Sequence, residues 1–268
     1  MPFFSQFPKI DYDFAANGID TKIIDLFRFV KASDVFLDDM SIYQYYQVRN
    51  GDRPDVVSHE LYGTTEYYWT FFLINEHLKT GLSGWPMSPD QFEDYMDLEY
   101  GGTVLSTRPV IVRDGDGLIT EFRNSLADRF TVGETVTGLI SGATGIVVSK
   151  DTQLSQLLLR AVDGVFQESE LIVGSLSADT VTTLYVYDHR DAPHHYEDAN
   201  GLISYNALQI DEQRSPEGMQ EGVSNSELTA VSNYEYETQL NDERANIRVL
   251  RPTAVYKFAQ AFRDLIND

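Results

Sequence analysis

The sequence predicts an α+β protein: a strand-helix-helix module with extra helices, into which a small β-barrel or sandwich domain is inserted. Two changes of pattern support this. Residues 1–100 and 224–268 are helix-patterned, whereas residues 110–187 are rich in Gly, Thr, Val and Ser with strand-like alternation. The inserted part also contains an internal repeat. With 268 residues and 42% apolar content, the chain is long enough to bury a substantial core.

Residues 1–41 form the first segment, which we expect to be an N-terminal arm followed by a helix. Aromatic side chains punctuate the first residues without a helical period, so that part is extended or irregular. From Asp20 to Ala32 the apolar residues Ile23, Ile24, Phe27 and Val30 share one helical face. This spacing predicts a helix over Asp20–Ala32.

Residues 42–100 form the next segment, which begins with a strand from Ile42 to Val48. The run Asn50–Asp52 is a turn signal. Asp52 is a candidate cap for the following helix, because Pro54 suits the first helical turn. Gly63 is expected to end that helix.

A second helix is expected to begin at Thr64 or Thr65. Between Tyr67 and Ile74 only Thr70 is neither apolar nor aromatic, so the helix has no conventional solvent face. It must be covered on several sides. The cover comes either from other segments of the same chain or from a partner subunit, and the sequence leaves both open.

The region 110–187 contains a repeat whose offset is 36 residues. Each copy has a strand, a turn of small residues and a second strand, which is typical of a hairpin. Two hairpins predict a small barrel or sandwich, and we interpret this region as a rigid spacer or docking domain. The recurring residues are Phe130, Glu134, Val136, Gly138, Ser141 and Thr144, followed by Phe166, Glu170, Ile172, Gly174, Ser177 and Thr180.

Residues 188–223 are sparse in apolar side chains and are expected to form a polar connector. Residues 224–268 then return to helix and strand and should pack with the N-terminal part. Within them, residues 226–244 are compatible with a helix and the run from Ala245 to Leu250 with a short strand. The last segment, Thr253 to Ile266, predicts an amphipathic helix. Its apolar stripe is Val255, Phe258, Ala259, Phe262, Leu265 and Ile266.

Composition excludes several classes of function. The chain has no cysteine, which removes disulfides, thiolate catalysis and Cys-ligated metals. Its formal charge of −22 opposes nucleic acid and anionic membrane as partners, so basic protein surfaces are better candidates. No apolar run of membrane-spanning length and no secretory leader is visible, and we expect a soluble protein that is not exported conventionally.

Three short patterns in the sequence resemble metal-binding motifs, but none is sufficient to predict a metal site. His59 and Glu60 begin like a zinc helix, but Gly63 stands where the second ligand is needed. Asp114–Ile119 copies the middle of a calcium loop, although a turn into a strand explains it better. A metal site built from His189, His194 and His195 with nearby carboxylates would need the connector to fold back on itself. We therefore expect no enzyme, and no catalytic, cofactor-binding or metal-binding residues.

The run from Ile42 to Asn75 resembles the LysM module. The matching residues are Tyr46-Gln47-Val48 with Gly51-Asp52, then Val57-Ser58, Leu61-Tyr62-Gly63-Thr64 and Asn75. LysM modules are known mainly as binders of N-acetylglucosamine polymers. The resemblance thus implies one candidate function, binding of peptidoglycan.

A longer resemblance is to the LysM-like baseplate wedge subunit of T-even-type contractile-tailed bacteriophages, over residues 1 to about 100 and 224–268. It rests on Asp25-Leu26-Phe27-Arg28, Tyr45-Tyr46, Arg53-Pro54, Leu61-Tyr62-Gly63, Tyr68-Trp69, Gly84-Trp85 and Glu243-Arg244. The 110–187 repeat departs from the short form of that family.

The longer resemblance implies a structural protein of the virion, located in the tail baseplate and assembled in the host cytoplasm. It would clamp neighbouring wedge subunits through protein–protein contacts, in multiple copies of a symmetric assembly. Its partners would be other wedge proteins, with the central hub as a further candidate. The partner-binding candidates are Arg53, Pro54, Tyr62, Tyr67, Tyr68, Trp69, Trp85, Phe258 and Phe262.

Overall fold

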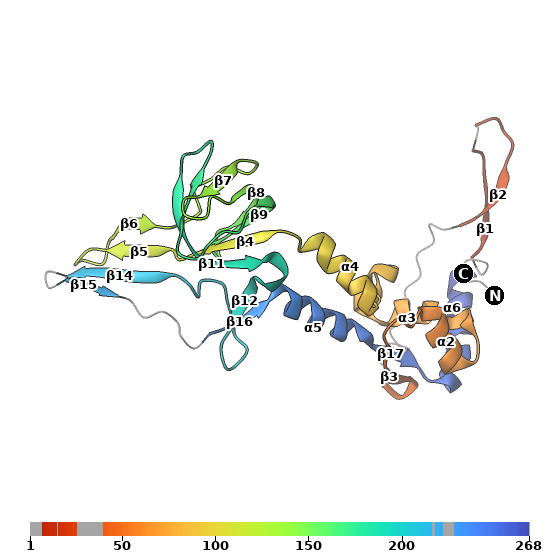
Figure 1. Ribbon diagram of the computed structural model, residues 1–268. Coiled ribbons are helices and arrows are strands. Elements are labelled where there is room, and N and C mark those ends of the chain that lie inside the picture. Colours follow the sequence, from red (N-terminus) through yellow and green to blue (C-terminus); the bar gives the residue numbers. More distant parts are fainter. Residues whose placement is uncertain (1–6, 15, 26–39, 216–217, 222–227, 268) are drawn as a thin grey trace. The chain divides into compact units, whose positions relative to one another are not determined.

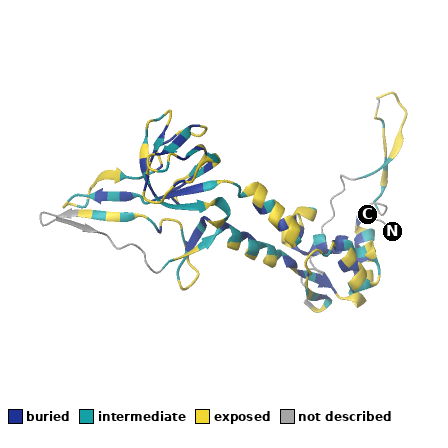
Figure 2. Cartoon of the chain, in the orientation of Figure 1, coloured by how far each residue is buried: buried dark blue, intermediate teal, exposed yellow. Residues whose placement is uncertain are grey.

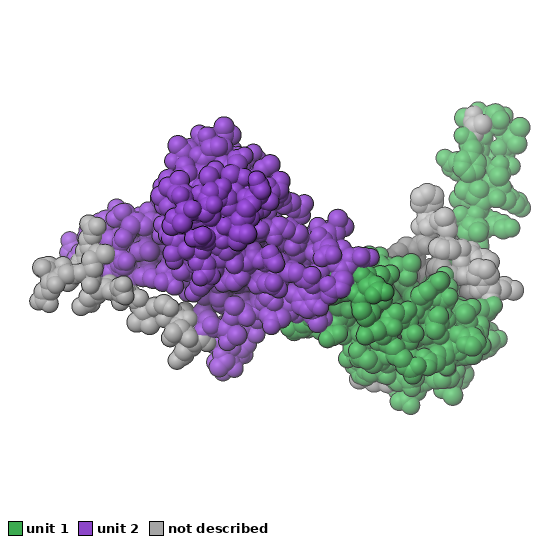
Figure 3. Space-filling model, in the orientation of Figure 1, with its two compact units in different colours: residues 1–92, 239–268 green, residues 93–238 purple. Residues whose placement is uncertain are grey.

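The computed structural model describes residues 7–14, 16–25, 40–215, 218–221 and 228–267. The chain divides into two compact units (Figure 3). Unit 1 comprises Met1–Phe92 and Gln239–Asp268, and unit 2 comprises Glu93–Thr238. The chain passes between the units inside two helices, α4 (Pro89–Glu99) and α5 (Asn233–Ala245).

The N-terminal part of unit 1 contains an antiparallel hairpin of β1 (Lys9–Tyr12) and β2 (Thr21–Ile24) (Figure 1). The helix predicted over Asp20–Ala32 is therefore wrong across β2, and residues 26–32 lie outside the described residues. β2 is rich in β-branched residues, which favour extended backbone, and Gly18 turns the chain at a φ of 78°.

The central sheet of unit 1 pairs two strands that are far apart in the sequence. β3 (Tyr43–Gln47) lies antiparallel to β17 (Asn246–Leu250), and both strands were predicted. α2 (Pro54–Tyr62) follows β3 and ends as expected at Gly63, whose φ is 71°. Asp52 does not cap α2, because the N-cap position falls on Arg53, which makes no capping bond through its side chain.

The aromatic segment that follows is broken into a 3-10 turn, Thr65–Tyr67, and the short helix α3 (Trp69–Ile74). Its cover comes from the same chain. Trp69 is only 3% exposed, and its ring lies 4.8 Å from that of Phe262 and 6.3 Å from that of Phe258. Of the two alternatives for this helix, the described residues show cover by the chain's own segments.

The two phenylalanines belong to α6 (Pro252–Asn267), which confirms the predicted C-terminal amphipathic helix. Leu265 was placed on its buried stripe, but it is 43% exposed, because it lies beside the stripe rather than on it. The stripe that packs into the core is Val255, Phe258, Ala259, Phe262 and Ile266.

Unit 2 contains a closed six-stranded barrel in which every neighbouring pair is antiparallel. The two predicted hairpins are present as β7 (Thr135–Gly138) with β8 (Thr144–Asp151), and β10 (Leu171–Gly174) with β11 (Thr180–Asp188). Closure also needs β4 (Thr103–Thr107) and β9 (Gln156–Asp163). Figure 2 shows buried positions along the barrel strands and exposed positions at the loops.

The rest of unit 2 contains two further sheets. One has the order β15-β14-β5-β6, from Gly218–Glu221, Ile210–Ser215, Val110–Arg113 and Ile119–Arg123. The other has the order β13-β12-β16, from Ile203–Ser204, Pro193–Glu197 and Thr229–Ser232. Strands thus run through the expected polar connector and through the start of the helix-compatible stretch. Tyr196 of β12, for example, packs with Leu154 and Ala207 from turns far away in the sequence, so these apolar residues leave no local period.

Candidate interaction groove

Unit 1 contains a groove of about 1060 Å³ between the start of α2 and the segment that leads into α4. Four of the predicted partner-binding residues line it: Arg53, Pro54, Tyr68 and Trp85. The other lining residues are Gly51, Asp52, Asp55, Leu82, Ser83, Pro86, Met87, Ser88 and Gln91. We call this feature the groove.

The first wall of the groove is built by the turn between β3 and α2. Gly51 adopts a φ of 82°, which only glycine takes up readily, and the chain then enters α2 with Pro54 at the first helical turn. Arg53 and Asp55 form an ion pair of 3.2 Å at the rim. Since both side chains are largely exposed, this pair contributes little to stability.

The second wall is held to the first by the indole of Trp85, whose Nε1 donates a hydrogen bond of 2.8 Å to the backbone carbonyl of Asp52. Asn241 fixes the next turn of the wall, because its amide accepts from Met87 N and donates to Met87 O. The groove is therefore preformed by hydrogen bonds rather than shaped by a ligand.

The entry into α4 supports the same wall. Ser88 and Gln91 bond each other's backbone reciprocally, which is a capping box at the helix start. Gly84 lets the wall approach closely, since a Cβ there would lie 2.5 Å from the His77 carbonyl oxygen. In the sequence, Gly84-Trp85 stood out in this wall only through the family resemblance, and no periodic pattern predicted Leu82, Met87 or Gln91 as lining residues.

The groove combines apolar walls with an excess of negative charge. Its lining has two carboxylates, Asp52 and Asp55, against the single guanidinium of Arg53. The Oδ2 atom of Asp52 is buried and has no hydrogen-bond partner, which is costly for a carboxylate oxygen. Leu82 is 72% exposed. A ligand that brings both an apolar group and a positive charge therefore suits this lining.

The remaining predicted residues lie in or against the core and do not line the groove. Trp69, Phe258 and Phe262 are buried together. Tyr62 donates to the carbonyl of Leu250 at 3.0 Å, and burial raises the pKa of its hydroxyl. Tyr67 is half-buried with its ring edge-on to Tyr62 at 5.9 Å. These five side chains position α3 and α6, and partner contacts through them stay a prediction.

The histidine group of unit 2 is a packed cluster. Nδ1 of His194 lies 2.8 Å from Nδ1 of His195, whose Nε2 lies 3.0 Å from a carboxylate oxygen of Glu197. The His194 ring stacks on Tyr236 at 3.7 Å, and burial, followed by the neighbouring His195, lowers the pKa of His194. Within the residues the structure describes, no three His, Asp or Glu side chains gather as metal ligands.

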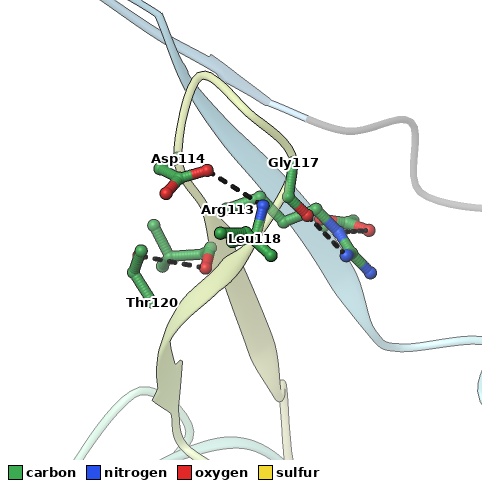
Figure 4. Close-up of polar contacts among 7 residues, drawn as sticks. Arg113, Asp114, Gly117, Leu118 and Thr120 are labelled. Carbon is green, nitrogen blue, oxygen red and sulfur yellow. Dashed lines mark hydrogen bonds and ion pairs between the residues drawn. The ribbon is translucent and has the colours of Figure 1, made fainter.

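The calcium-loop pattern is the hairpin turn between β5 and β6, as the sequence favoured (Figure 4). The Asp114 carboxylate accepts hydrogen bonds from the backbone N–H groups of Asp116 at 3.0 Å and Leu118 at 2.9 Å. Arg113 donates to the Gly117 carbonyl at 3.1 Å and pairs with Asp211. These carboxylates already have partners inside the protein.

The two glutamates of the barrel repeat have a role that the sequence did not reveal. The Glu134 carboxylate accepts from the backbone N–H groups of Leu176 and Ser177, each at 3.0 Å, in the turn of the other repeat. The Glu170 carboxylate accepts from Ile140 and Ser141 in the turn of the first repeat. We call these reciprocal contacts the carboxylate staples.

Burial alone would raise the pKa of both glutamates, since they are 1% and 0% exposed. The hydrogen bonds outweigh burial and hold the pKa of each carboxyl below its ordinary value. The repeated glycines make room for the staples, because a Cβ on Gly138 would lie 2.5 Å from a Glu170 oxygen and one on Gly174 2.7 Å from a Glu134 oxygen. The staples are structural.

The residues that line the groove lie in the part of the chain that matches a known protein family. Residues 2–94 match the family model described as base plate wedge protein 53. No curated protein matches the chain. None of the helices in the described residues has the length and apolarity to span a membrane.

Proposed function

We propose that this chain is a structural, non-enzymatic baseplate wedge protein of a phage tail and that it clamps neighbouring wedge subunits together through protein–protein contacts. The groove of unit 1 is the contact site in this proposal. It lies within the matched residues and is lined by Arg53, Pro54, Tyr68 and Trp85. The preformed groove is the observation that carries the proposal.

A LysM-like core is part of the proposal. The order β3, α2, α3 and then an antiparallel return strand, β17, supports it. In this chain the return strand follows α3 only after the whole of unit 2, so the module is completed by a distant segment. We interpret the barrel of unit 2 as a rigid spacer or docking domain.

The groove favours a protein partner over a glycan. Sugar rings stack on open aromatic faces, but Trp85 is only 8% exposed and its indole N–H already bonds Asp52. A preformed groove with apolar walls suits side chains of a partner protein, for which little ordering is needed on binding. Other wedge proteins are the proposed partners, with the hub as a further candidate and several copies in one symmetric assembly.

The test is co-migration of the chain with neighbouring wedge proteins in size-exclusion chromatography. Leu82→Lys should abolish co-migration, because it puts a positive charge on the exposed apolar edge of the groove. Leu202→Lys is the matched control, since Leu202 is 71% exposed and does not line the groove. Co-migration of Leu82→Lys at the wild-type level would contradict the proposal. Retention of the chain on insoluble peptidoglycan would instead support the glycan alternative.

A further inference from the structure

We infer that the groove binds an extended segment of a partner protein that carries an arginine or lysine next to proline or other apolar residues. This inference rests on the proposed function and names the chemistry of the partner. It draws on the shape of the groove, its charge and its rigidity.

The shape of the groove fits an extended segment. Its volume of about 1060 Å³ is at the upper end of small-ligand pockets, so several side chains can enter together. The accessible part of its apolar lining is the exposed Leu82 with the half-buried Tyr68, Pro86 and Met87. Grooves with an aromatic and apolar lining bind extended proline-containing segments, which lose little conformational freedom on docking.

The charge of the groove selects a cationic residue in that segment. Arg53 already pairs with Asp55, and no ion pair among the described residues involves the second lining carboxylate, Asp52. A guanidinium or ammonium group brings several donors and makes charge-assisted hydrogen bonds to a carboxylate. The net charge of −22 attracts a basic segment at long range and repels an acidic one.

The rigidity of the groove makes such a small contact effective. The Trp85–Asp52 bond, the two Asn241 bonds and the Ser88–Gln91 capping box fix both walls before binding. A preformed site spends little of its binding free energy on ordering itself. Short peptides should therefore show the preference without the rest of the partner.

The experiment uses the full chain and two fluorescein-labelled hexapeptides. One has the sequence proline-leucine-arginine repeated twice, and the other has glutamate in place of arginine. Fluorescence anisotropy at low salt should show that the arginine peptide binds at least about tenfold more tightly. Raising the salt concentration should weaken that binding.

The variant Asp52→Asn separates a local contact from the general negative charge. It should weaken binding of the arginine peptide about tenfold, while Glu168→Gln, which removes the same charge from an exposed position on unit 2, should leave binding unchanged. Circular dichroism confirms that both variants fold. Equal weakening in both variants would overturn the inference.

The failure of this inference differs from the failure of the proposed function. If the chain joins wedge complexes through the groove but binds both peptides equally or neither, the inference is wrong and the proposed function stands. If Leu82→Lys still joins the complexes, the proposed function is wrong, and the inference resting on it is overturned as well.

Discussion

Different kinds of contact stabilise unit 1 and the barrel of unit 2, each within itself. In unit 1, large rings from distant segments meet, as Trp69 of α3 does with Phe258 and Phe262 of α6. In the barrel, two buried carboxylates cross between adjacent repeats and bond backbone N–H groups. Ring packing does not depend on ionisation, whereas the carboxylate staples do. The two units should therefore respond differently to pH and to substitution.

The tryptophans allow the two responses to be measured separately. The chain has two, Trp69 and Trp85, and both lie in unit 1. Tryptophan fluorescence therefore reports the unfolding of unit 1, while far-ultraviolet circular dichroism also includes the strands of the barrel. Each prediction below is measured with one or both of these signals.

The largest effect is expected for Trp69→Ala, which removes the ring at the centre of the unit 1 core. Loss of a buried Trp costs about 3 to 5 kcal/mol of unfolding free energy, because a cavity remains. Urea unfolding followed by the fluorescence of the remaining Trp85 should show this loss. A loss below about 1 kcal/mol would contradict the core role of Trp69.

The next effect is expected for Glu134→Ala and Glu170→Ala in the barrel. Each variant leaves buried or partly buried backbone N–H groups of a turn without their acceptor. We expect a cost of roughly 2 to 4 kcal/mol per variant, seen by circular dichroism. The matched control Glu168→Ala removes an exposed carboxylate and should change stability by less than about 0.5 kcal/mol.

A smaller effect is expected from acid. Because the pKa of each staple glutamate is lowered in the folded barrel, its stabilisation is full above the unfolded pKa of about 4.3 and is lost as the pH falls through the lower folded pKa. Urea unfolding at neutral and acid pH should therefore show a barrel-specific loss. In the double variant Glu134→Gln and Glu170→Gln, that pH dependence should shrink, and an unchanged dependence would refute the role of the staples.

The smallest effect is expected at the barrel rim, where the repeats differ. Leu139 is 61% exposed, and the equivalent position of the second repeat is Ser175. Because the same backbone accommodates serine there, Leu139→Ser should change the unfolding free energy by less than about 0.5 kcal/mol. A larger loss, measured by circular dichroism, would mean that the rim leucine packs into the barrel.

Local signals in the sequence predicted much of unit 1 and the hairpins of the barrel. The stripe of α6, the strands β3 and β17, the stop at Gly63 and those hairpins all follow from short-range patterns. The groove itself was not predicted, although four of its lining residues were partner-binding candidates. One of its walls is fixed by Asn241, which bonds Met87 from the far end of the chain, and no local pattern encodes such a contact.

Most of the predictions that were wrong or missing also concern contacts between segments that are distant in the sequence. The strands of the expected connector pair with segments far away, as β14 does in parallel with β5 and β12 with β16. The staples join Glu134 to a turn more than one repeat away, so the sequence repeat indicated the hairpins but not their reciprocal bonds. The hairpin of β1 and β2 was missed because Ile23 and Ile24 fit a helical face as well as a strand.

The residues of unit 2 are inserted within the sequence of unit 1, and this insertion sets an order for folding during synthesis. All residues of unit 2 leave the ribosome before β17 and α6, which complete the unit 1 sheet and cover Trp69. A contiguous domain folds as a unit while the chain grows, so the barrel can be finished while α3 still exposes its rings. During that interval the nascent chain exposes the apolar side chains of α3, which are covered only when the last segment has left the ribosome.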